Sequence, residues 1–99
     1  MNTPLAKRAM SFSEALHWVK IGYRIRRIGW NGKGMWVAFT PGSVIKRSEA
    51  KELSALSHIF DNEVVDSVNV LGHLDMRAAD GSLVIGWLAS QTDMLAEDW

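Results

Sequence analysis

The chain has no cysteine, no long apolar run and no net charge. The lack of cysteine excludes disulfides, thiolate nucleophiles and Cys-ligated zinc or iron–sulfur sites. No run of about 18 apolar residues is present, so we expect no membrane-spanning helix. The start of the chain also lacks the apolar stretch of a signal peptide. Together these absences predict a cytoplasmic protein that does not act at a membrane.

The net charge of zero hides an uneven distribution along the chain. Residues 1–33 hold seven Lys and Arg against one acid, Glu14, whereas residues 34–99 hold four basic and ten acidic residues. The first part therefore carries a charge of +6 and the second a charge of −6. Overall neutrality argues against a protein that coats a nucleic-acid polymer. The asymmetry is typical of a site for a small anion or of a self-complementary assembly.

A length of 99 residues and an apolar content of 47% predict one domain with a packed core. We expect residues 1–10 to form a flexible N-terminal arm and residues 11–99 to form a single domain. Within it, residues 44–72 are expected to be a variable excursion from the sheet. In this excursion we predict a short helix capped by Ser48 and then a short valine-rich strand. The buried side of that helix would carry Leu53, Leu56 and Phe60.

Capping boxes mark the start of two further helices. Ser11 and Glu14 fit the first box, and apolar residues at helical spacing extend the helix over about 12–21. Ser90 and Asp93 fit the second box, which predicts a short C-terminal helix at about 91–97.

Two hairpins are predicted between these helices. In the first, strands at 23–28 and 35–40 flank Asn31-Gly32, a strong hairpin-turn signal. In the second, residues 73–87 fold around Asp80-Gly81, and a two-residue turn would place Met76 opposite Ile85. We therefore expect an α+β fold, a small antiparallel sheet of two hairpins packed on an N-terminal helix, with a short C-terminal helix.

The side chains offer little for catalysis. The three histidines are scattered, and none has a partner at metal-ligand spacing. No nucleophile elbow or Walker phosphate loop is present. Paired carboxylates for acid–base catalysis would have to come from Asp75, Asp80, Asp93, Glu97 or Asp98. Of these, Asp80 is explained by a turn, Asp93 by a cap, and Glu97 and Asp98 by a frayed end. We therefore predict no catalytic residue, no metal ligand and no cofactor.

Binding is better supported, first around the glycine-rich turn. An exposed Trp30 would stack on a purine, which contributes roughly 1–3 kcal/mol per base. Arg24, Arg26 and Lys33 lie close to it in sequence and would meet phosphates through charge-assisted hydrogen bonds. In the alternative interpretation, Trp30 covers the sheet and the basic residues form a solvated strand face.

The start of the C-terminal helix is the second candidate region. Backbone N–H groups near Ser90, Gln91 and Thr92 would favour an anion, because they point away from the helix end without intrahelical partners. Asp93 would repel a phosphate but accept hydrogen bonds from ribose hydroxyls. The residues alone thus predict a nucleotide-sized site with its base on Trp30 and its sugar near Asp93.

Two stretches carry a family resemblance. They are RIGWNGKGMW, residues 27–36, and the C-terminal third from Met76 through WLASQTDMLAEDW, residues 87–99. With the helix entry at Ser11, they resemble phage Thoeris anti-defence proteins of the second type. Residues 44–72 carry no such resemblance. The family often has Val-Pro before the late tryptophan, whereas Ile85-Gly86 precede Trp87 here, so the direction of Trp87 is open.

The resemblance implies a function. Members of this family bind a cyclic ADP-ribose isomer that signals infection in the bacterial host cell, and they hold it without cutting it. Some relatives also bind cyclic dinucleotides, and members assemble as homotetramers with sites between protomers. The resemblance places Trp30 and Asn31 at the stacking end of the ligand, and Ser90, Gln91, Thr92 and Asp93 at its polar end. Phosphate contacts from Arg24, Arg26, Arg27 and Lys33 are inferred from charge, and Trp87 completes the candidate ligand-binding set.

Other functions remain open at this level. The chain could instead be a small module that binds nucleotides or single-stranded nucleic acid, or a hydrolase of the same cyclic nucleotides. An assembly protein without any ligand is a further alternative.

Overall fold

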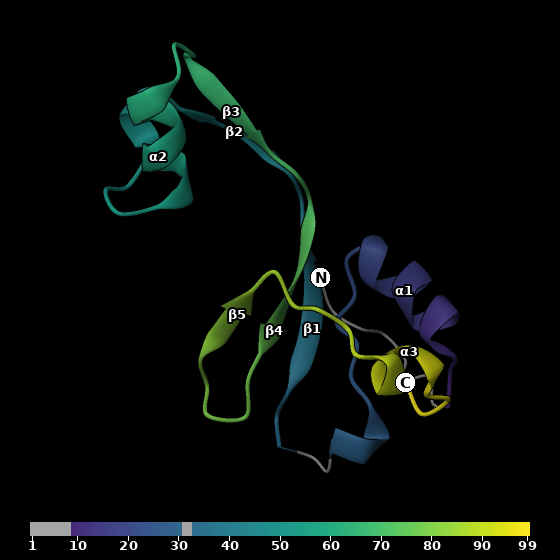
Figure 1. Ribbon diagram of the computed structural model, residues 1–99. Coiled ribbons are helices and arrows are strands. Elements are labelled where there is room, and N and C mark those ends of the chain that lie inside the picture. Colours follow the sequence, from purple (N-terminus) through teal and green to yellow (C-terminus); the bar gives the residue numbers. More distant parts are fainter. Residues whose placement is uncertain (1–8, 31–32) are drawn as a thin grey trace. The chain divides into compact units, whose positions relative to one another are not determined.

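The computed structural model describes residues 9–30 and 33–99, and the chain divides into two units. The first unit contains the described residues up to Thr40 together with residues 73–99. The second unit is the intervening segment, residues 41–72. The mixed fold is confirmed, with an N-terminal helix, small antiparallel sheets and a short C-terminal helix (Figure 1).

Helix α1 (Phe12–Lys20) opens the first unit where the capping box predicted it. The Ser11 side chain accepts a hydrogen bond from the Glu14 N–H, and the Glu14 side chain accepts one from the Ser11 N–H. Ala15 and Val19 are fully buried on the inner side of the helix. Their apolar surface joins the core of the unit, whose other buried members are Met10, Ile25, Val37, Met76 and Trp99.

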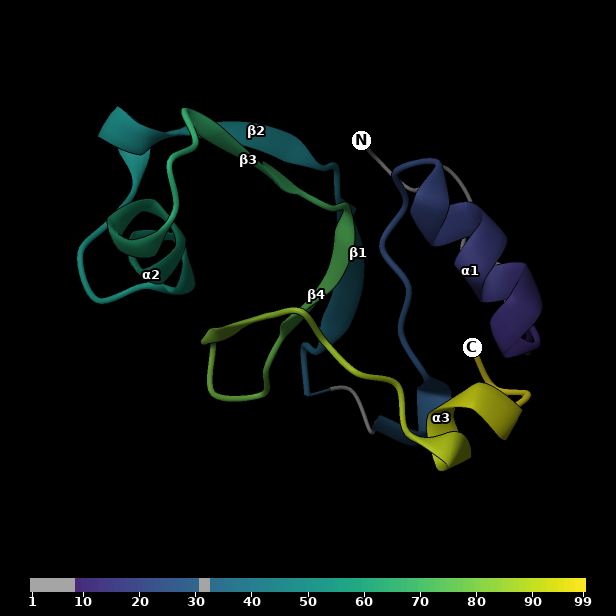
Figure 2. The ribbon, with the colours of Figure 1, turned by 45° about the horizontal axis from the view of Figure 1, so that its top comes forward.

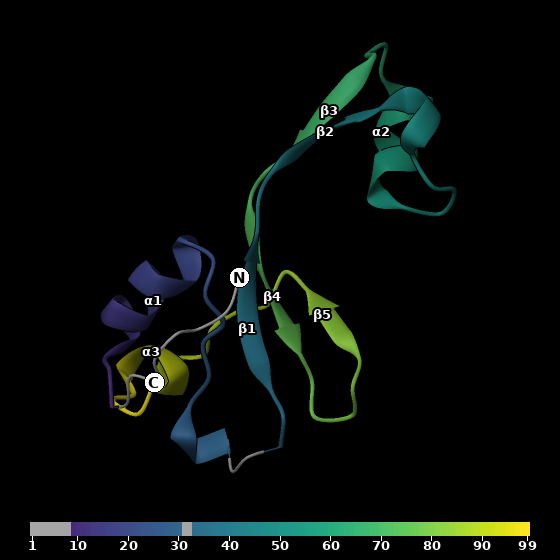
Figure 3. The ribbon, with the colours of Figure 1, turned by 180° about the vertical axis from the view of Figure 1, so that it is seen from behind.

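The sheet of the first unit has three antiparallel strands in the order β1-β4-β5. These are β1 (Trp36–Thr40), β4 (His73–Arg77) and β5 (Leu83–Ile85). Helix α1 contacts both β1 and the C-terminal helix α3 (Gln91–Leu95). Figures 2 and 3 show α1 and α3 together beside β1, on the side away from β5.

The predicted strand over 23–28 is wrong except at one residue. Ile25 forms an isolated antiparallel bridge with Val37, and Ile28–Trp30 is a short 3-10 helix. The C-terminal segment causes this, because Asp98 accepts hydrogen bonds from the backbone N–H groups of Ile28 and Gly29. Those groups are then not available to a strand partner. The predicted turn at Asn31-Gly32 lies outside the described residues.

The second hairpin exists, but its predicted register is wrong by one residue. Met76 pairs with Val84, while Ile85 pairs with Asp75. The loop holds three residues instead of two, and Gly81 adopts a φ of +90° within it. This is the known alternative of a type I turn followed by a left-handed glycine. A one-residue shift moves every side chain of β5 to the opposite sheet face, so Ile85 lies on the face of Asp75 and not on that of Met76.

The second unit pairs β2 (Ser43–Lys46) with β3 (Ser67–Val70) and carries α2 (Ala55–Asn62) between them. The predicted cap at Ser48 is wrong, because Arg47–Glu49 is a 3-10 turn and Ser54 caps α2. Phe60 is buried as predicted. Leu53 was predicted to be buried but is fully exposed, since it lies before the cap with a φ of 56°. Within the residues the structure describes, no helix is long and apolar enough to cross a membrane.

Candidate functional site

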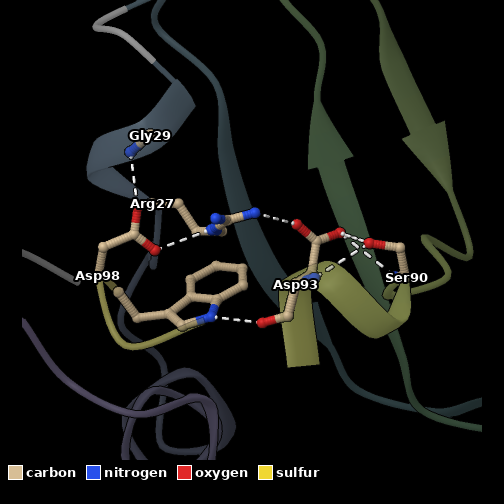
Figure 4. Close-up of polar contacts among 6 residues, drawn as sticks. Arg27, Gly29, Ser90, Asp93 and Asp98 are labelled. Atoms are coloured by element: carbon tan, nitrogen blue, oxygen red, sulfur yellow. Dashed lines mark hydrogen bonds and ion pairs between the residues drawn. The ribbon is translucent and has the colours of Figure 1, made fainter. Parts of the chain in front are cut away.

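The end of the chain closes onto the segment that precedes the glycine-rich turn, and Arg27 is the centre of this closure (Figure 4). Its Nε donates to Asp98 and one terminal nitrogen donates to Asp93, each at 2.9 Å. Asp98 also accepts the Gly29 N–H at 2.8 Å. We call Arg27, Gly29, Ser90, Asp93 and Asp98 the Arg27 cluster. It joins residues that are more than sixty positions apart in sequence.

The charges of the Arg27 cluster stabilise one another. Hydrogen bonds to Asp98 and then to Asp93 raise the pKa of Arg27. The pKa of Asp98 is lowered by the hydrogen bond from Arg27 and then by the one from Gly29. Burial raises the pKa of Asp93, but hydrogen bonds from Arg27 and Ser90 outweigh it and lower the pKa overall. Both carboxylates therefore stay ionised beside the guanidinium at neutral pH.

Asp93 serves the helix end and Arg27 at the same time. One of its carboxylate oxygens accepts from Arg27, and the other accepts from the backbone N–H and the hydroxyl of Ser90. The Ser90 hydroxyl in turn accepts the Asp93 N–H at 3.0 Å, which completes the predicted capping box. The predicted helix to residue 97 ends at Leu95 instead.

Three indoles lie next to the Arg27 cluster. Trp30, Trp87 and Trp99 contact one another edge to face, with ring centroids 5.2 to 6.4 Å apart, and we call them the indole cluster. The Trp99 indole N–H donates to the Asp93 carbonyl oxygen at 2.8 Å. Such edge-to-face aromatic pairs favour fixed ring orientations. Trp99 is buried, whereas Trp30 and Trp87 are half-buried and present part of their surface to solvent.

The other predicted site residues are distributed around these two clusters. The Arg24 guanidinium lies over the Trp36 ring, 5.4 Å from its centroid. Arg26 and Lys33 are exposed. Gln91 and Thr92 are exposed in the first turn of α3, directly after Ser90. Asn31 lies outside the described residues. Arg27, Ser90, Asp93, Trp30 and Trp87 are thus drawn together, while Arg24 stacks on β1.

Two contributors were missed from the sequence. Asp98 was assigned to a frayed end, yet it bonds Arg27 and Gly29, and the neighbouring Trp99 exchanges backbone hydrogen bonds with Met10. Met10, which we assigned to the N-terminal arm, is buried. No local signal could have found these contacts, because each partner lies at the other end of the chain.

A second polar network surrounds Asp75 on β4. Its carboxylate accepts hydrogen bonds from the Thr40 hydroxyl, from the Gly86 N–H at 2.9 Å and from His73 Nδ1 at 2.7 Å. We call these four residues the Asp75 network. The alternation of His73 and Asp75 along a strand places both on one face, which is the signal that could have found them.

The direction of Trp87 follows from the backbone just before it. Gly86 has a φ of +78°, a conformation that proline cannot adopt, and its N–H is committed to Asp75. The Trp87 N–H then donates to the Leu74 carbonyl at 2.7 Å. The Trp87 ring lies against Trp30 and Trp99.

Comparison with known proteins agrees with the motif resemblance. The family model described as Tad2-like, a Thoeris anti-defense 2-like domain, matches residues 10–99. The chain is 35% identical over 95 residues to Thoeris anti-defense 2 of Bacillus phage SP01, and the match covers 94% of each protein. A match of this length and identity spans both the Arg27 cluster and the indole cluster. The chain therefore belongs to the Thoeris anti-defense 2-like (Tad2-like) family.

Proposed function

We propose that this chain is an anti-defence sponge, a protein that binds a cyclic nucleotide immune signal and holds it without cleaving it. The proposed ligand is a cyclic ADP-ribose isomer, with cyclic dinucleotides as a second class. The chain would act in the cytoplasm of an infected bacterial host. Family membership supports the anti-Thoeris role, and the arrangement of the first unit supports a nucleotide-sized ligand.

One observation carries the proposal. The residues predicted for the base end and those predicted for the sugar end lie far apart in sequence but are linked through two contacts. Arg27 bonds Asp93, and the Trp99 ring lies 5.2 Å from Trp30 while its N–H bonds the Asp93 carbonyl oxygen. A single ligand of nucleotide size could therefore contact aromatic surface and polar groups together.

We assign roles by chemistry. Trp30 and Trp87 supply half-buried indole surface for a base. Arg24, Arg26 and Lys33 supply cations for the phosphates. Arg27 has five N–H donors, of which two are committed to Asp98 and Asp93, and its side chain is 17% exposed. Ser90, Gln91, Thr92 and Asp93 would face the sugar and phosphate end, with Asn31 beside Trp30.

Sequestration requires tight binding, and assembly would help to provide it. A nanomolar Kd corresponds to about −12 kcal/mol, which demands a preorganised and well-enclosed site. Few side chains of a 99-residue protomer are available to enclose a ligand. We propose that sites lie between protomers of a homotetramer. The exposed apolar side chains of β5, Leu83 and Ile85, offer contact surface for such an assembly.

The decisive experiment separates holding from cleavage. The protein is incubated with the cyclic ADP-ribose isomer, freed of unbound ligand, denatured by heat, and the released material is identified by mass spectrometry. We expect intact ligand at a constant ratio to protein. Release of cleaved product only would identify a hydrolase and contradict the proposal. Salt-sensitive binding that prefers long oligonucleotides would instead identify a nucleic-acid binder.

Variants test the assigned roles in the same assay. Trp30→Ala should weaken ligand binding by about tenfold or more, because one stacking contact is lost. Arg26→Gln should weaken binding in a salt-dependent manner. Lys51→Gln, an exposed cation in the second unit, is the matched control and should bind as the wild type does. Unchanged binding by Trp30→Ala would contradict the stacking role.

A further inference from the structure

Asp75 is the charged residue most removed from solvent among those the structure describes, with an exposure of 5%. It lies in the middle of β4 and uses both carboxylate oxygens. One oxygen accepts from Thr40 at the end of β1. The other accepts from both His73 and the Gly86 N–H. A buried carboxylate is costly unless it is fully hydrogen-bonded, and this one is bonded on both sides.

The electrostatics of this position favour a carboxylate that stays ionised. Burial raises the pKa of Asp75, but hydrogen bonds from Thr40, Gly86 and His73 outweigh burial and lower the pKa overall. Two of these donors, Thr40 and His73, lie opposite each other on the paired strands β1 and β4, so their hydrogen bonds to Asp75 remain within the sheet. The third donor, Gly86, lies beyond the last residue of β5.

The bond to Gly86 leads directly to the indole cluster. Gly86 has a φ of +78°, and a Cβ built there would meet no described heavy atom within 4 Å. The backbone conformation, and not close packing, therefore accounts for glycine at this position. The next residue is Trp87, whose N–H donates to the carbonyl of Leu74, the residue before Asp75. Leu74 and Asp75 of β4 thus accept the backbone N–H groups of Trp87 and Gly86, which lie between β5 and α3.

We propose that Asp75 is a positioning residue of the ligand site, which holds Gly86 and thereby directs the Trp87 ring against Trp30. This inference rests on the proposed function, because it treats Trp30 and Trp87 as the stacking surface. Asp75 itself does not touch the ligand. Without its carboxylate, the segment between β5 and α3 loses one of the two backbone anchors described above. The Trp87 ring would then sample several orientations, and the Trp30 surface would lose its support.

The test compares three variants that differ at the carboxylate. Asp75→Ala removes the acceptor for the Gly86 N–H. Asp75→Asn keeps an oxygen acceptor at the same position and should rescue the site. Thr40→Val removes a donor to the other carboxylate oxygen and is the matched control, because it leaves the Gly86 bond in place. Each variant, like the wild type, is also made with Trp87→Phe. The near-ultraviolet circular dichroism of the protein with the Trp87→Phe change is subtracted from that of the same protein without it, and the difference is the contribution of Trp87.

We expect Asp75→Ala to lose the Trp87 contribution to the dichroism and to bind the cyclic ADP-ribose isomer about tenfold more weakly. Asp75→Asn and Thr40→Val should keep both properties near those of the wild type. An unchanged Trp87 contribution in Asp75→Ala would overturn the inference. Wild-type protein that binds no ligand would overturn the proposed function alone, because the dichroism still decides the role of Asp75.

A second measurement covers the case in which Asp75→Ala does not fold. Hydrogen exchange of the Gly86 amide is followed by NMR in the wild type, in Asp75→Asn and in Thr40→Val. We expect this amide to be protected in all three proteins, because its acceptor is retained. Exchange of the Gly86 amide at the unprotected rate in the folded wild type would overturn the inference.

Discussion

Arg27 in the first unit and Arg47 in the second both connect segments of their own unit, but they bond different groups. Arg27 donates to the carboxylates of Asp93 and Asp98. Arg47 donates to the backbone carbonyls of Phe60, Glu63 and Val65, and its guanidinium lies 5.0 Å from the centroid of the Phe60 ring. One arginine is thus neutralised by carboxylates, whereas the other keeps its charge and is held by the oxygens of peptide carbonyl groups.

The difference determines how each unit responds to its surroundings. Acid protonates carboxylates but not backbone carbonyl groups. It can therefore break the ion pairs of Arg27, whereas the hydrogen bonds of Arg47 keep their acceptors. The partners of Arg27 also come from the segment that carries the predicted sugar end of the site, whereas Arg47 bonds the end of α2 and the residues that follow it. All five tryptophans lie in the first unit, so tryptophan fluorescence follows that unit alone.

Removal of the Arg27 side-chain charge should have the largest effect on stability. Arg27→Met keeps the apolar stem but leaves Asp93 and Asp98 without their cation, and the loss of two hydrogen bonds between charged, partly buried groups costs about 3 kcal/mol. Urea unfolding monitored by tryptophan fluorescence measures the loss. Arg26→Met, at the exposed neighbouring position, is the matched control and should change stability by less than about 0.5 kcal/mol. Equal stability of the two variants would show that the Arg27 cluster has no net effect.

Acid should destabilise the first unit by the next largest amount. The pKa values of Asp93 and Asp98 are lowered in the folded protein from an ordinary 3.8, so the unfolded chain takes up protons first. Their contribution is fully present above about pH 5 and is lost as pH falls below about 4. We expect a loss of about 2 kcal/mol, the contribution of a hydrogen bond to a charged group.

The comparison with Arg27→Met tests the cause of this acid sensitivity. The urea concentration at the unfolding midpoint of the wild type should decrease as the pH is lowered from 5 to 3. The midpoint of the variant should decrease less over the same range. The variant keeps the contribution of Asp75, whose pKa is also lowered, because burial is outweighed by its hydrogen bonds from Thr40, Gly86 and His73. Identical pH profiles would show that Arg27 is not the partner that matters.

Arg47→Met should have a smaller effect that is confined to the second unit. The exposed side chain loses three hydrogen bonds to carbonyl groups and its contact with Phe60, so we expect about 1–2 kcal/mol. Hydrogen exchange of the α2 amides should speed up accordingly, while the tryptophan-monitored transition stays in place. Lys51→Met is the control in the same unit. A large shift of the tryptophan transition would contradict the separate roles of the two arginines.

Local patterns predicted the parts of this molecule that depend on neighbouring residues. The capping boxes at Ser11 and Ser90 are present, because each needs only side chains three residues apart. The hairpin around Gly81 was also predicted, but Asp-Gly suits both a two-residue and a three-residue loop. A two-residue type I′ turn needs a positive φ at both of its residues, and only Gly81 has one here, not Asp80. The register and the sheet faces therefore could not be obtained from the turn alone.

Contacts between distant segments account for the remaining errors. The strand expected before Trp30 gives way to a 3-10 helix because Asp98 bonds its N–H groups. The phosphate contact of Arg27 stays a prediction, but its carboxylate partners at the other end of the chain were not foreseen. A single sequence indicates that a cation is present but not which group lies opposite it. The residue types of the Arg27 cluster were thus visible in the sequence, but the bonds between them were not.

The smallest effects should come from the helix caps, which form the same motif in both units. Ser90 caps α3 and Ser54 caps α2, and each hydroxyl accepts an N–H from the third residue of its helix. Ser90→Ala and Ser54→Ala should each cost about 1 kcal/mol. Ser90→Ala should cost slightly more, because the Ser90 hydroxyl also holds the Asp93 carboxylate that faces Arg27. Ser90→Ala should shift the urea unfolding transition monitored by tryptophan fluorescence. Ser54→Ala should change only the hydrogen exchange of the α2 amides. A double variant Arg27→Met with Ser90→Ala completes the comparison: if the cap orients Asp93 for Arg27, the combined loss will be smaller than the two single losses together.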